Sequence, residues 1–397
     1  MDVAARLDQL QAAKLRRRLR LVESSQGPRV TLEGREVIVL CSSNYLGLAD
    51  NPRVRQAAAD AAERWGAGAG ASRLACGNMG PHERLERAIA EFHDRPAALL
   101  FGSGYLANVG AITALAGEGD IVFADELSHP SVIDGCRLSR AHRFAYRHRD
   151  LEHLAWGLRK AGDRAALIAT DGIFALDGDV APLPELAELA ARHRCRLVVN
   201  EAHAVGTIGP GGRGTVAAAG LGGEIDVIVG SLSKALGSYG AYVCASEEVR
   251  ELLINCARPF IFSTAPPPPA VGAAFAALRM LDSRPGVVTQ LRRNAAALRE
   301  ALAEAGLDIG GGRTQIVPVM VGDSARAMEL SERVLAAGVY AEAVRPPAVP
   351  EGTARLRLAV MANHRVDELQ NAAHAIGRAA RELGLTRGAE RELPRAA

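Results

Sequence analysis

The stretch Asp226–Gly240, which reads DVIVGSLSKALGSYG, is the part of the chain that decides the fold. Its β-branched run at residues 227–229 is typical of a buried strand, and the glycines that follow predict a tight turn. Lys234 stands directly after this strand, among small residues and two hydroxyls. Desolvation of that kind lowers the pKa of a lysine amine and makes it a Schiff-base nucleophile. The stretch therefore predicts a strand that ends at a reactive lysine.

Two other interpretations of Lys234 are open. A lysine after a strand is commonly a surface residue without a chemical role. The pair Ser231-x-x-Lys234 also fits the serine and lysine motif of penicillin-binding proteins, but neither Ser-Asp-Asn nor Lys-Thr-Gly follows it. The rest of the chain must therefore decide between these interpretations.

Composition and charge exclude several classes of protein. The 397 residues suffice for one large domain or two of moderate size, and 47 basic residues nearly balance 45 acidic ones. This balance gives no electrostatic basis for binding nucleic acid or an anionic membrane. We find no apolar signal region and no stretch that approaches a membrane span, which predicts a soluble, cytoplasmic protein.

The cysteines lack the spacing of a metal site. They are scattered along the chain at Cys41, Cys76, Cys136, Cys195, Cys244 and Cys256. Several lie in apolar, strand-like surroundings, so we expect reduced thiols in a reducing compartment and no bound metal.

Helical and apolar strand-like segments alternate from Asn51 to about Met280. The expected strands are Ala97–Phe101, Asp120–Ala124, Ala165–Thr170, Arg196–Val199, Asp226–Gly230 and Ala241–Cys244, with helices such as Pro81–His93 and Leu183–His193. This alternation predicts an α/β fold with a mainly parallel sheet that helices cover on both faces. Ligands of such sheets gather at the carboxyl ends of the strands. Polar residues follow several of those ends here: Glu126 to His129, Asp171, Asn200 to His203 and Ser231 to Lys234.

We expect three segments: an N-terminal helix and strand in residues 1–50, a large domain in 51–281 and a smaller α+β domain in 282–397. The first 25 residues have the apolar spacing of an amphipathic helix, whose later part is the basic run 14–20. The four prolines at 266–269 predict a break after Thr264. Further expected elements are a strand at Glu36–Ser42, a long helix from about Asp282, strands near Gln315–Val321 and Ala354–Val360, a helix from Arg365 to about Leu383, and a polar tail from Arg387.

A glycine-rich turn, Phe101-Gly102-Ser103-Gly104-Tyr105-Leu106-Ala107-Asn108, follows one expected strand and opens a helix. Backbone amides at such a turn suit a phosphate group. The turn also matches G-x-G-x-x-A, so a dinucleotide site is a second interpretation. Asp120 and Asp125 beyond it fit the ribose partner only loosely. A single phosphate suits the turn equally well, and a purely structural turn stays open.

Two histidines also follow expected strands. His129 lies in Asp125-Glu126-Leu127-Ser128-His129-Pro130, and His203 closes Asn200-Glu201-Ala202-His203. Either histidine alone is more often structural, but a neutral imidazole can lie on an aromatic ring or move a proton. Together with Lys234 and the phosphate-suited turn, they indicate a phosphorylated aldehyde cofactor held as a Schiff base.

The chain resembles the α-oxoamine synthase family of fold-type I pyridoxal phosphate enzymes over nearly its whole length. The matching segments are Tyr45–Leu48, Phe101–Asn108, Ser128–Ser131, Asp177–Asp179, Glu201–His203, Ser231–Gly237, Arg345–Pro347 and Arg355–Leu358. The last two, with Ala257–Phe262, favour the biotin branch over glycine acetyltransferase, aminolevulinate synthase or serine palmitoyltransferase. The resemblance implies a pyridoxal 5'-phosphate cofactor and a homodimer with its sites at the subunit interface.

The resemblance also implies roles for single residues. Lys234 would form the Schiff base and move protons at the substrate α-carbon, His129 would stack on the cofactor ring, and His203 would bond to its phenolic oxygen. The phosphate would be held by Gly104, Tyr105, Ser231 and Thr264 of the partner subunit. The substrate would meet Arg16 at the acyl-CoA, Arg357 at the amino acid carboxylate, and Ser43 and Ala348 along its length.

Several matched positions depart from the family. Asn200 stands where the family places an aspartate against the pyridine nitrogen, and a neutral amide keeps that nitrogen protonated far less well. Glu201 is no substitute, because adjacent strand residues point to opposite faces. Ala175 replaces a serine that contacts the cofactor, Ser43 an asparagine that helps to hold the substrate, and Ala348 a threonine.

The resemblance implies a pyridoxal phosphate-dependent acyltransferase that condenses L-alanine with pimeloyl-CoA, or with a pimeloyl carrier protein, and releases carbon dioxide and coenzyme A. Two alternatives remain. Ser43 and Ala348 would line the substrate, so another amino acid or acyl thioester is the first. Asn200 makes a cofactor-binding protein with impaired catalysis the second.

Overall fold

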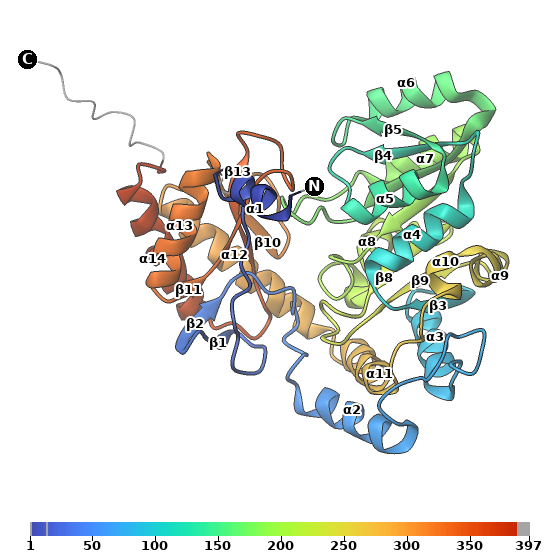
Figure 1. The fold of residues 1–397 in the computed structure, drawn as a ribbon, viewed down its shortest axis with the longest axis horizontal. Coiled ribbons are helices and arrows are strands. Elements are labelled where there is room, and N and C mark those ends of the chain that lie inside the picture. Colours follow the sequence, from blue (N-terminus) through green and yellow to red (C-terminus); the bar gives the residue numbers. More distant parts are fainter. Residues whose placement is uncertain (1, 13–14, 387–397) are drawn as a thin grey trace, which may run out of the picture. The chain divides into compact units, whose positions relative to one another are not determined.

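The computed structural model describes residues 2–12 and 15–386, which form two compact units (Figure 1). The large unit comprises residues 43–175 and 179–289, and the described residues of the small unit are 2–12, 15–42, 176–178 and 290–386. The N-terminal segment was expected over residues 1–50; its described residues up to 42 belong to the small unit, and residues 43–50 belong to the large unit. Lys14 and the polar tail 387–397 lie outside the described residues.

A seven-stranded sheet forms the centre of the large unit, in the order β3-β9-β8-β7-β6-β4-β5. The strands are β3 Ala97–Phe101, β4 Ile121–Asp125, β5 His142–Tyr146, β6 Ala165–Asp171, β7 Arg196–Asn200, β8 Val227–Ser231 and β9 Ala241–Ala245. Neighbours are parallel except around β9, which runs antiparallel to β3 and β8. Every residue of β3, β4, β8 and β9 is buried, so both faces of the sheet are covered. The predicted α/β fold with a mainly parallel sheet is confirmed.

The six strands expected in this region are all present, each end within one residue of its expected place. Strand β5 was not predicted from the sequence. This strand lies at the edge of the sheet, and its residues alternate irregularly between exposed and partly buried. An edge strand of this kind carries neither the continuous apolar run of a buried strand nor a clean period of two.

Helices surround this sheet. They are α2 Pro52–Trp65, α3 Gly80–Phe92, α4 Gly104–Leu115, α5 Pro130–Ser139, α6 Leu151–Ala161, α7 Leu183–His193, α8 Thr215–Ala219, α9 Glu247–Cys256, α10 Arg258–Ile261 and α11 Pro268–Ser283. Helix α4 packs against α5 and β8, α6 against α7, and α11 against α2 and α3. The proline run behaves as expected: Pro266 and Pro267 precede α11, and the next two occupy its first turn, where a missing N–H is tolerated.

The small unit contains two three-stranded sheets. One has the order β1-β2-β11 and the other β10-β13-β12. Its strands are β1 Arg29–Leu32, β2 Arg35–Val39, β10 Ile316–Gly322, β11 Val339–Tyr340, β12 Glu342–Val344 and β13 Ala354–Ala359. Its helices are α1 Val3–Ala12, α13 Ser324–Ala336 and α14 Val366–Glu382. Helix α12 Gly286–Glu304 begins in the large unit and continues into the small unit. The strands and terminal helix expected in residues 315–383 are confirmed.

The expected helix over the first 25 residues is wrong beyond α1, which ends at Ala12. Residues 15–21 have no regular structure, and the Arg18 and Arg20 side chains pair with Glu33 instead. None of the residues of α1 is buried, and a short helix without a packed face has little to stabilise it in water. No helix in the described ranges, α1 included, is long and apolar enough to cross a membrane.

Gly230, on the central strand β8, has no room for a side chain. It pairs with Tyr242 of β9, and a Cβ at residue 230 would lie 2.0 Å from the Tyr242 ring. Gly230→Ala should therefore lower the free energy of unfolding by about 1–3 kcal/mol or more, as overpacked cores do. Urea denaturation measures the loss. Gly223→Ala is the control, because a Cβ there meets nothing within 4 Å; equal midpoints for the two variants would contradict the packing.

Candidate active site

The carboxyl ends of adjacent parallel strands bring several predicted residues to one edge of the large sheet. Strand β6 ends at Asp171, β7 ends at Asn200, and β8 leads through Ser231 to Lys234. Asp171 pairs in register with Asn200, and β7 pairs in parallel with β8. Because parallel strands end on the same side, these side chains share one edge of the sheet.

Lys234 lies in a tight turn close to His129 and Asp171. The Lys234 ammonium contributes to lowering the pKa of His129 and opposes the rise in the pKa of Asp171. The turn requires glycine at residue 237, where φ is 61° and a Cβ would lie 2.4 Å from the Ala49 nitrogen. The chain contains three lysines, Lys14, Lys160 and Lys234, and Lys160 is exposed on α6. Lys234 is the lysine that the fold places at the strand ends.

His129 caps the N-terminus of α5 and is held as a neutral ring. Burial, with a smaller effect of Lys234, lowers its pKa to about 4. Its Nδ1 accepts the Ser131 N–H at 3.2 Å and lies 2.7 Å from the Ser131 hydroxyl, which in turn accepts from Asn108 Nδ2 at 2.9 Å. A backbone N–H can only donate, so Nδ1 is the acceptor and the ring proton lies on Nε2. Ser131 and Asn108 therefore fix both the tautomer and the orientation of His129.

Asp171 and Asn200 form a buried pair. Asn200 Nδ2 donates to Asp171 Oδ1 at 2.6 Å, and the other carboxyl oxygen accepts the His129 N–H at 2.9 Å. Asp171 is 2% exposed and Asn200 is 4% exposed. Burial raises the pKa of Asp171 to about 7, although Asn200, the His129 N–H and Lys234 oppose the rise. The site thus holds a carboxyl whose charge can change near neutral pH.

His203 and Glu201 follow Asn200 in the chain and point to different surroundings. His203 Nδ1 lies 2.6 Å from the hydroxyl of Tyr45, which is fully buried. The Glu201 carboxylate instead accepts the Thr215 hydroxyl and N–H, with the Val216 N–H as a third donor. The Glu201 carboxylate therefore binds groups other than those that Asn200 binds. It does not supply the negative charge of the aspartate that Asn200 replaces.

The turn before α4 has the geometry expected for an anion. Ser103 caps the helix by accepting the Leu106 N–H at 3.2 Å, so Gly104 and Tyr105 are the first two helical residues. Their N–H groups have no acceptor within the helix. A Cβ at Gly104 would meet nothing within 4 Å, which leaves the approach to these amides open. Helix α4 packs against β8, whose last residue Ser231 keeps its hydroxyl 3.0 Å from that of Ser233. These groups fit a phosphate.

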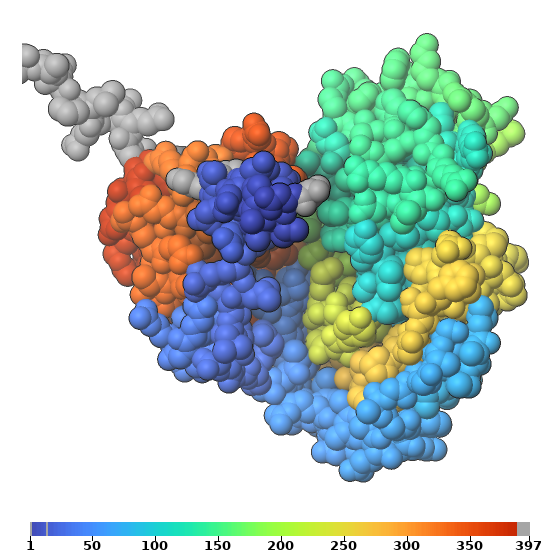
Figure 2. All heavy atoms as spheres, viewed as in Figure 1, coloured from blue at the N-terminus to red at the C-terminus, as the bar shows by residue number. Residues whose placement is uncertain are grey.

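Thr264 lies in an exposed segment that pairs with another part of the large unit. It forms an antiparallel bridge with Ser72, and the Ala265 N–H donates to the Ala71 carbonyl. Two large apolar side chains flank this bridge at the surface: Phe262 is 70% exposed and Leu74 is 55% exposed. In Figure 2 the yellow segments after residue 250 adjoin the light-blue segments near residue 75 on one face of this unit.

The remaining predicted residues belong to different units. Arg357, on β13, is buried in the small unit, and Ala348 is exposed in the loop after β12. The Arg16 side chain is exposed, and its carbonyl accepts from Arg345. Ser43 and Ala175 lie in the large unit, and Ala175 supplies no hydroxyl there. The substrate-binding roles of these residues stay predictions.

Asp125 belongs to a second buried network and is not placed for a ribose. Its carboxylate accepts the Leu127 and Arg149 N–H groups, and Oδ1 lies 2.9 Å from His148 Nδ1. The other ring nitrogen of His148 lies 2.7 Å from Asp179 Oδ2. Burial lowers the pKa of His148, but the two carboxylates outweigh it and raise the pKa to about 9. The network therefore pairs two carboxylates with a protonated His148.

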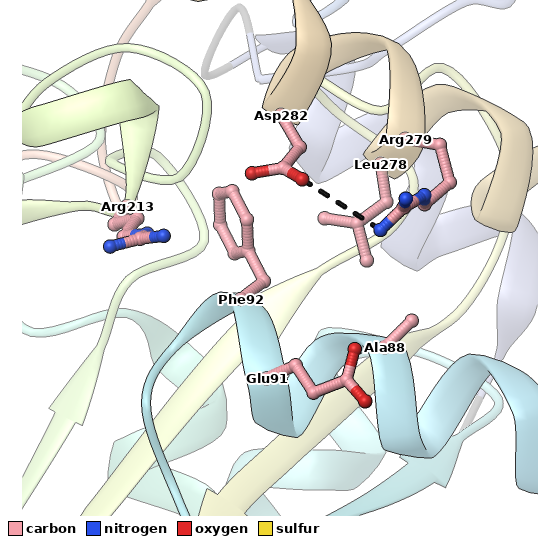
Figure 3. A pocket seen from close by; sticks show the side chains of 7 residues that line it. All are labelled: Ala88, Glu91, Phe92, Arg213, Leu278, Arg279 and Asp282. Atoms are coloured by element: carbon pink, nitrogen blue, oxygen red, sulfur yellow. Dashed lines mark ion pairs between the residues drawn. The ribbon is translucent and has the colours of Figure 1, made fainter.

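Figure 3 shows a cavity elsewhere in the large unit, lined by Ala88, Glu91, Phe92, Arg213, Leu278, Arg279 and Asp282. Three of its charged side chains have partners within the lining: Arg279 pairs with Asp282 at 3.7 Å, and the Arg213 guanidinium lies over the Phe92 ring. None of the predicted cofactor or substrate residues lines this cavity. The strand ends around Lys234 are therefore the better candidate site.

The residues that orient this site were not predicted from the sequence. Tyr45, Asn108 and Ser131 were quoted within motifs but given no role, and Asp171 was noted only as a polar residue at a strand end. The signal for Asp171 was available, because its strand was predicted, like several others, to end at polar residues. Pairing it with Asn200 required the strand order and the register.

The fold and the lysine at the end of β8 define a fold-type I pyridoxal phosphate enzyme. The model of the family "Aminotransferase class I and II" matches residues 35–376. 8-Amino-7-oxononanoate synthase of Geobacter sulfurreducens is 50% identical over 97% of this chain and 99% of that relative. The synthase of Anaeromyxobacter dehalogenans is 49% identical over 91% of each chain. A structure of serine palmitoyltransferase with a PLP internal aldimine has a TM-score of 0.91 and 33% identity, and covers 96% of this chain and 98% of that chain. The chain belongs to the class I and II aminotransferase family, within its α-oxoamine synthase group, and is similar to 8-amino-7-oxononanoate synthases.

His148 should make the stability of the protein depend on pH. Its pKa in the folded protein is raised above the unfolded value, so its contribution is complete below about pH 6.5 and is lost as the pH rises through about 9. His148→Gln should lower the free energy of unfolding by on the order of 2–3 kcal/mol at pH 6, and the difference should shrink toward pH 10. Chemical denaturation at a series of pH values measures it. His142→Gln, at an exposed position of β5, is the control, and a difference for His148→Gln that stays constant from pH 6 to pH 10 would refute the assignment.

Proposed function

We propose that the protein condenses L-alanine with a pimeloyl thioester, with loss of carbon dioxide, to give 8-amino-7-oxononanoate in biotin biosynthesis. The free thiol released is coenzyme A when pimeloyl-CoA is the donor. The observation that carries the proposal is the grouping of Lys234, neutral His129 and buried Asp171 in a chain 50% identical to such a synthase. Pyridoxal phosphate, when bound, supplies an electron sink for negative charge at the α-carbon of the amino acid.

The residues at the strand ends suit this cofactor. Lys234 would bond to its aldehyde and, when released, would take and return a proton at the substrate α-carbon. His129, neutral and held in one orientation by its bonds to Ser131, would lie on the face of the ring. His203, with its Nδ1 at Tyr45, would direct Nε2 to the phenolic oxygen. The amides of Gly104 and Tyr105 and the Ser231 hydroxyl would hold the phosphate.

The amino acid and the acyl donor are assigned by charge and by similarity. Arg357 is a cation that would pair with the carboxylate of alanine, and Arg16, exposed and within a basic segment, would meet the acyl-CoA. A related amino acid or acyl thioester is the second candidate. It is favoured by Ser43 and Ala348, which depart from the family at positions expected to line the substrate.

The cysteines support a reducing compartment, for which we propose the cytoplasm. All six are free thiols, and Cys136, Cys195 and Cys244 are buried. Burial raises the pKa of both Cys136 and Cys195 to about 11, which keeps them as unreactive thiols.

The bond to the cofactor is tested by trapping it. Borohydride reduction of the cofactor-loaded protein, followed by peptide mapping, should place the pyridoxyl mass on Lys234. Lys234→Ala should lose the label and the activity, whereas Lys160→Ala should keep both, because Lys160 is exposed on α6. A label on Lys160 or Lys14 in the reduced wild-type protein would sink the assignment. Product formation from L-alanine and pimeloyl-CoA, compared with glycine and serine as amino acids, decides the substrate.

A homodimer would place the exposed segment around Thr264 against a second subunit. Phe262 and Leu74 offer apolar area beside the Ser72–Thr264 bridge, as expected at a subunit contact. Phe262→Asp should therefore shift the protein toward monomer in light scattering and weaken cofactor binding at least about tenfold, since a loss of 1.4 kcal/mol is tenfold. Leu138→Asp, at an exposed position of α5, is the control. A wild-type monomer that binds pyridoxal phosphate tightly would contradict the proposal.

A further inference from the structure

The Asn200 amide has a fixed orientation between two groups. Its Oδ1 accepts the Ala202 N–H at 3.2 Å, and its Nδ2 donates to Asp171 Oδ1 at 2.6 Å. The Ala202 N–H can only donate, so it holds the amide oxygen on its own side and turns the NH2 group toward Asp171. A carbonyl oxygen has two lone pairs, and Oδ1 can accept a second hydrogen bond without turning.

Asp171 is placed to act on this amide. Its bond to Asn200 is short and fully buried, and hydrogen bonds in such surroundings polarise one another. A carboxylate at Nδ2 draws the amide hydrogen and increases the negative charge on Oδ1. The amide oxygen then becomes a better acceptor for a charged N–H group than an isolated asparagine would be.

We propose that Asp171, acting through Asn200, is the positioning residue that keeps the ring nitrogen of the cofactor protonated. The inference rests on the proposed function. The ring N–H would donate to Asn200 Oδ1, Asn200 Nδ2 would donate to the Asp171 carboxylate, and no proton leaves either partner. The family places a negative charge directly at residue 200. In this chain the corresponding negative charge would lie one side chain farther from the cofactor, on Asp171 of the neighbouring strand.

The surroundings of Asp171 are those of a carboxyl group that requires a nearby cation to be ionised. The charged groups that act on it are Lys234, which favours its ionised form, and Asp125, which opposes it. Asp125 is itself balanced by His148. Burial alone would keep Asp171 protonated near neutral pH. A protonated cofactor ring nearby would favour the ionised form of Asp171. By linkage, the Asp171 carboxylate would favour the protonated form of the ring.

In the variant Asn200→Asp, the new carboxyl would not act independently of Asp171. That variant would place two carboxyls in the positions now 2.6 Å apart, and such a pair titrates as a unit that shares one proton. The single replacement should therefore alter turnover less than a family comparison suggests. Exchanging the two residues, as Asp171→Asn with Asn200→Asp, keeps one carboxyl and one amide and should preserve the protonated ring.

The test reads the ring nitrogen directly. The protein is loaded with pyridoxal phosphate labelled with ¹⁵N in the ring, and the ¹⁵N shift is followed with pH by NMR in the wild-type protein, Asp171→Asn, Asn200→Ala and the exchanged double variant. Asp171→Asn and Asn200→Ala should each lower the pKa of the ring nitrogen by about one to two units, the usual effect of removing a nearby opposite charge. In the exchanged double variant, the pKa of the ring nitrogen should equal or exceed its value in the wild-type protein. Asp163→Asn, at an exposed position, is the control.

The outcomes separate the two proposals. A cofactor bonded to Lys234 whose ring nitrogen titrates identically in the wild type and Asp171→Asn would overturn the role of Asp171 and leave the proposed function intact. If Asp171→Asn does not fold, an unchanged ring nitrogen in Asn200→Ala has the same consequence. Wild-type protein that forms no bond between Lys234 and the cofactor would overturn the proposed function, and this inference with it.

Discussion

The parallel pairing of β6, β7 and β8 is the constraint on which the site depends. It places Asp171 in register with Asn200 and carries the chain from β8 to Lys234 at the same edge of the sheet. These strands are almost wholly buried, so their register is set by apolar side chains on both faces. A shift of one residue would turn those side chains to the wrong face and would also separate Asp171 from Asn200. Stability and chemistry therefore rest on the same hydrogen bonds.

The buried carboxyl groups of Asp125 and Asp171 around that edge each lie near a positively charged group. Asp171 has Lys234 nearby, Asp125 has His148, and His148 also meets Asp179. Burying an unpaired charge is costly, and each carboxyl here is held by backbone N–H groups or a neighbouring cation. Neutral His129 is the exception, and its low pKa follows from burial beside Lys234. A neutral ring is suited to the role proposed for His129, which is to lie on one face of the cofactor ring.

Sequence patterns predicted much of the architecture, for reasons that can be named. The strands that end at Asp171, Asn200 and Ser231 are continuous apolar runs, and such runs are informative wherever a strand is buried on both faces. The edge strand β5 was missed because it lacks this pattern, and the N-terminal helix was extended too far because apolar spacing alone does not supply a packing partner. Lys234, His129 and His203 were found because each follows a predicted strand. Their orienting partners, Tyr45 and Ser131, were not, since a single hydroxyl has no sequence signal until its neighbour is known.

The sequence by itself determined the α/β fold, the lysine at the strand end, the turn suited to phosphate and the replacement at Asn200. Each of these follows from a pattern along the chain: the fold from the alternation of apolar segments, and the other three from one strand end, one turn or one motif. The tertiary structure alone decided that Asp171 lies 2.6 Å from Asn200, that Glu201 faces Thr215, and that Ser131 fixes the tautomer of His129. Those facts join residues between two and 29 positions apart, with directions set by register and rotamer. Hydrogen bonds depend on distance and angle to within a few tenths of an ångström, and a linear sequence does not contain that information.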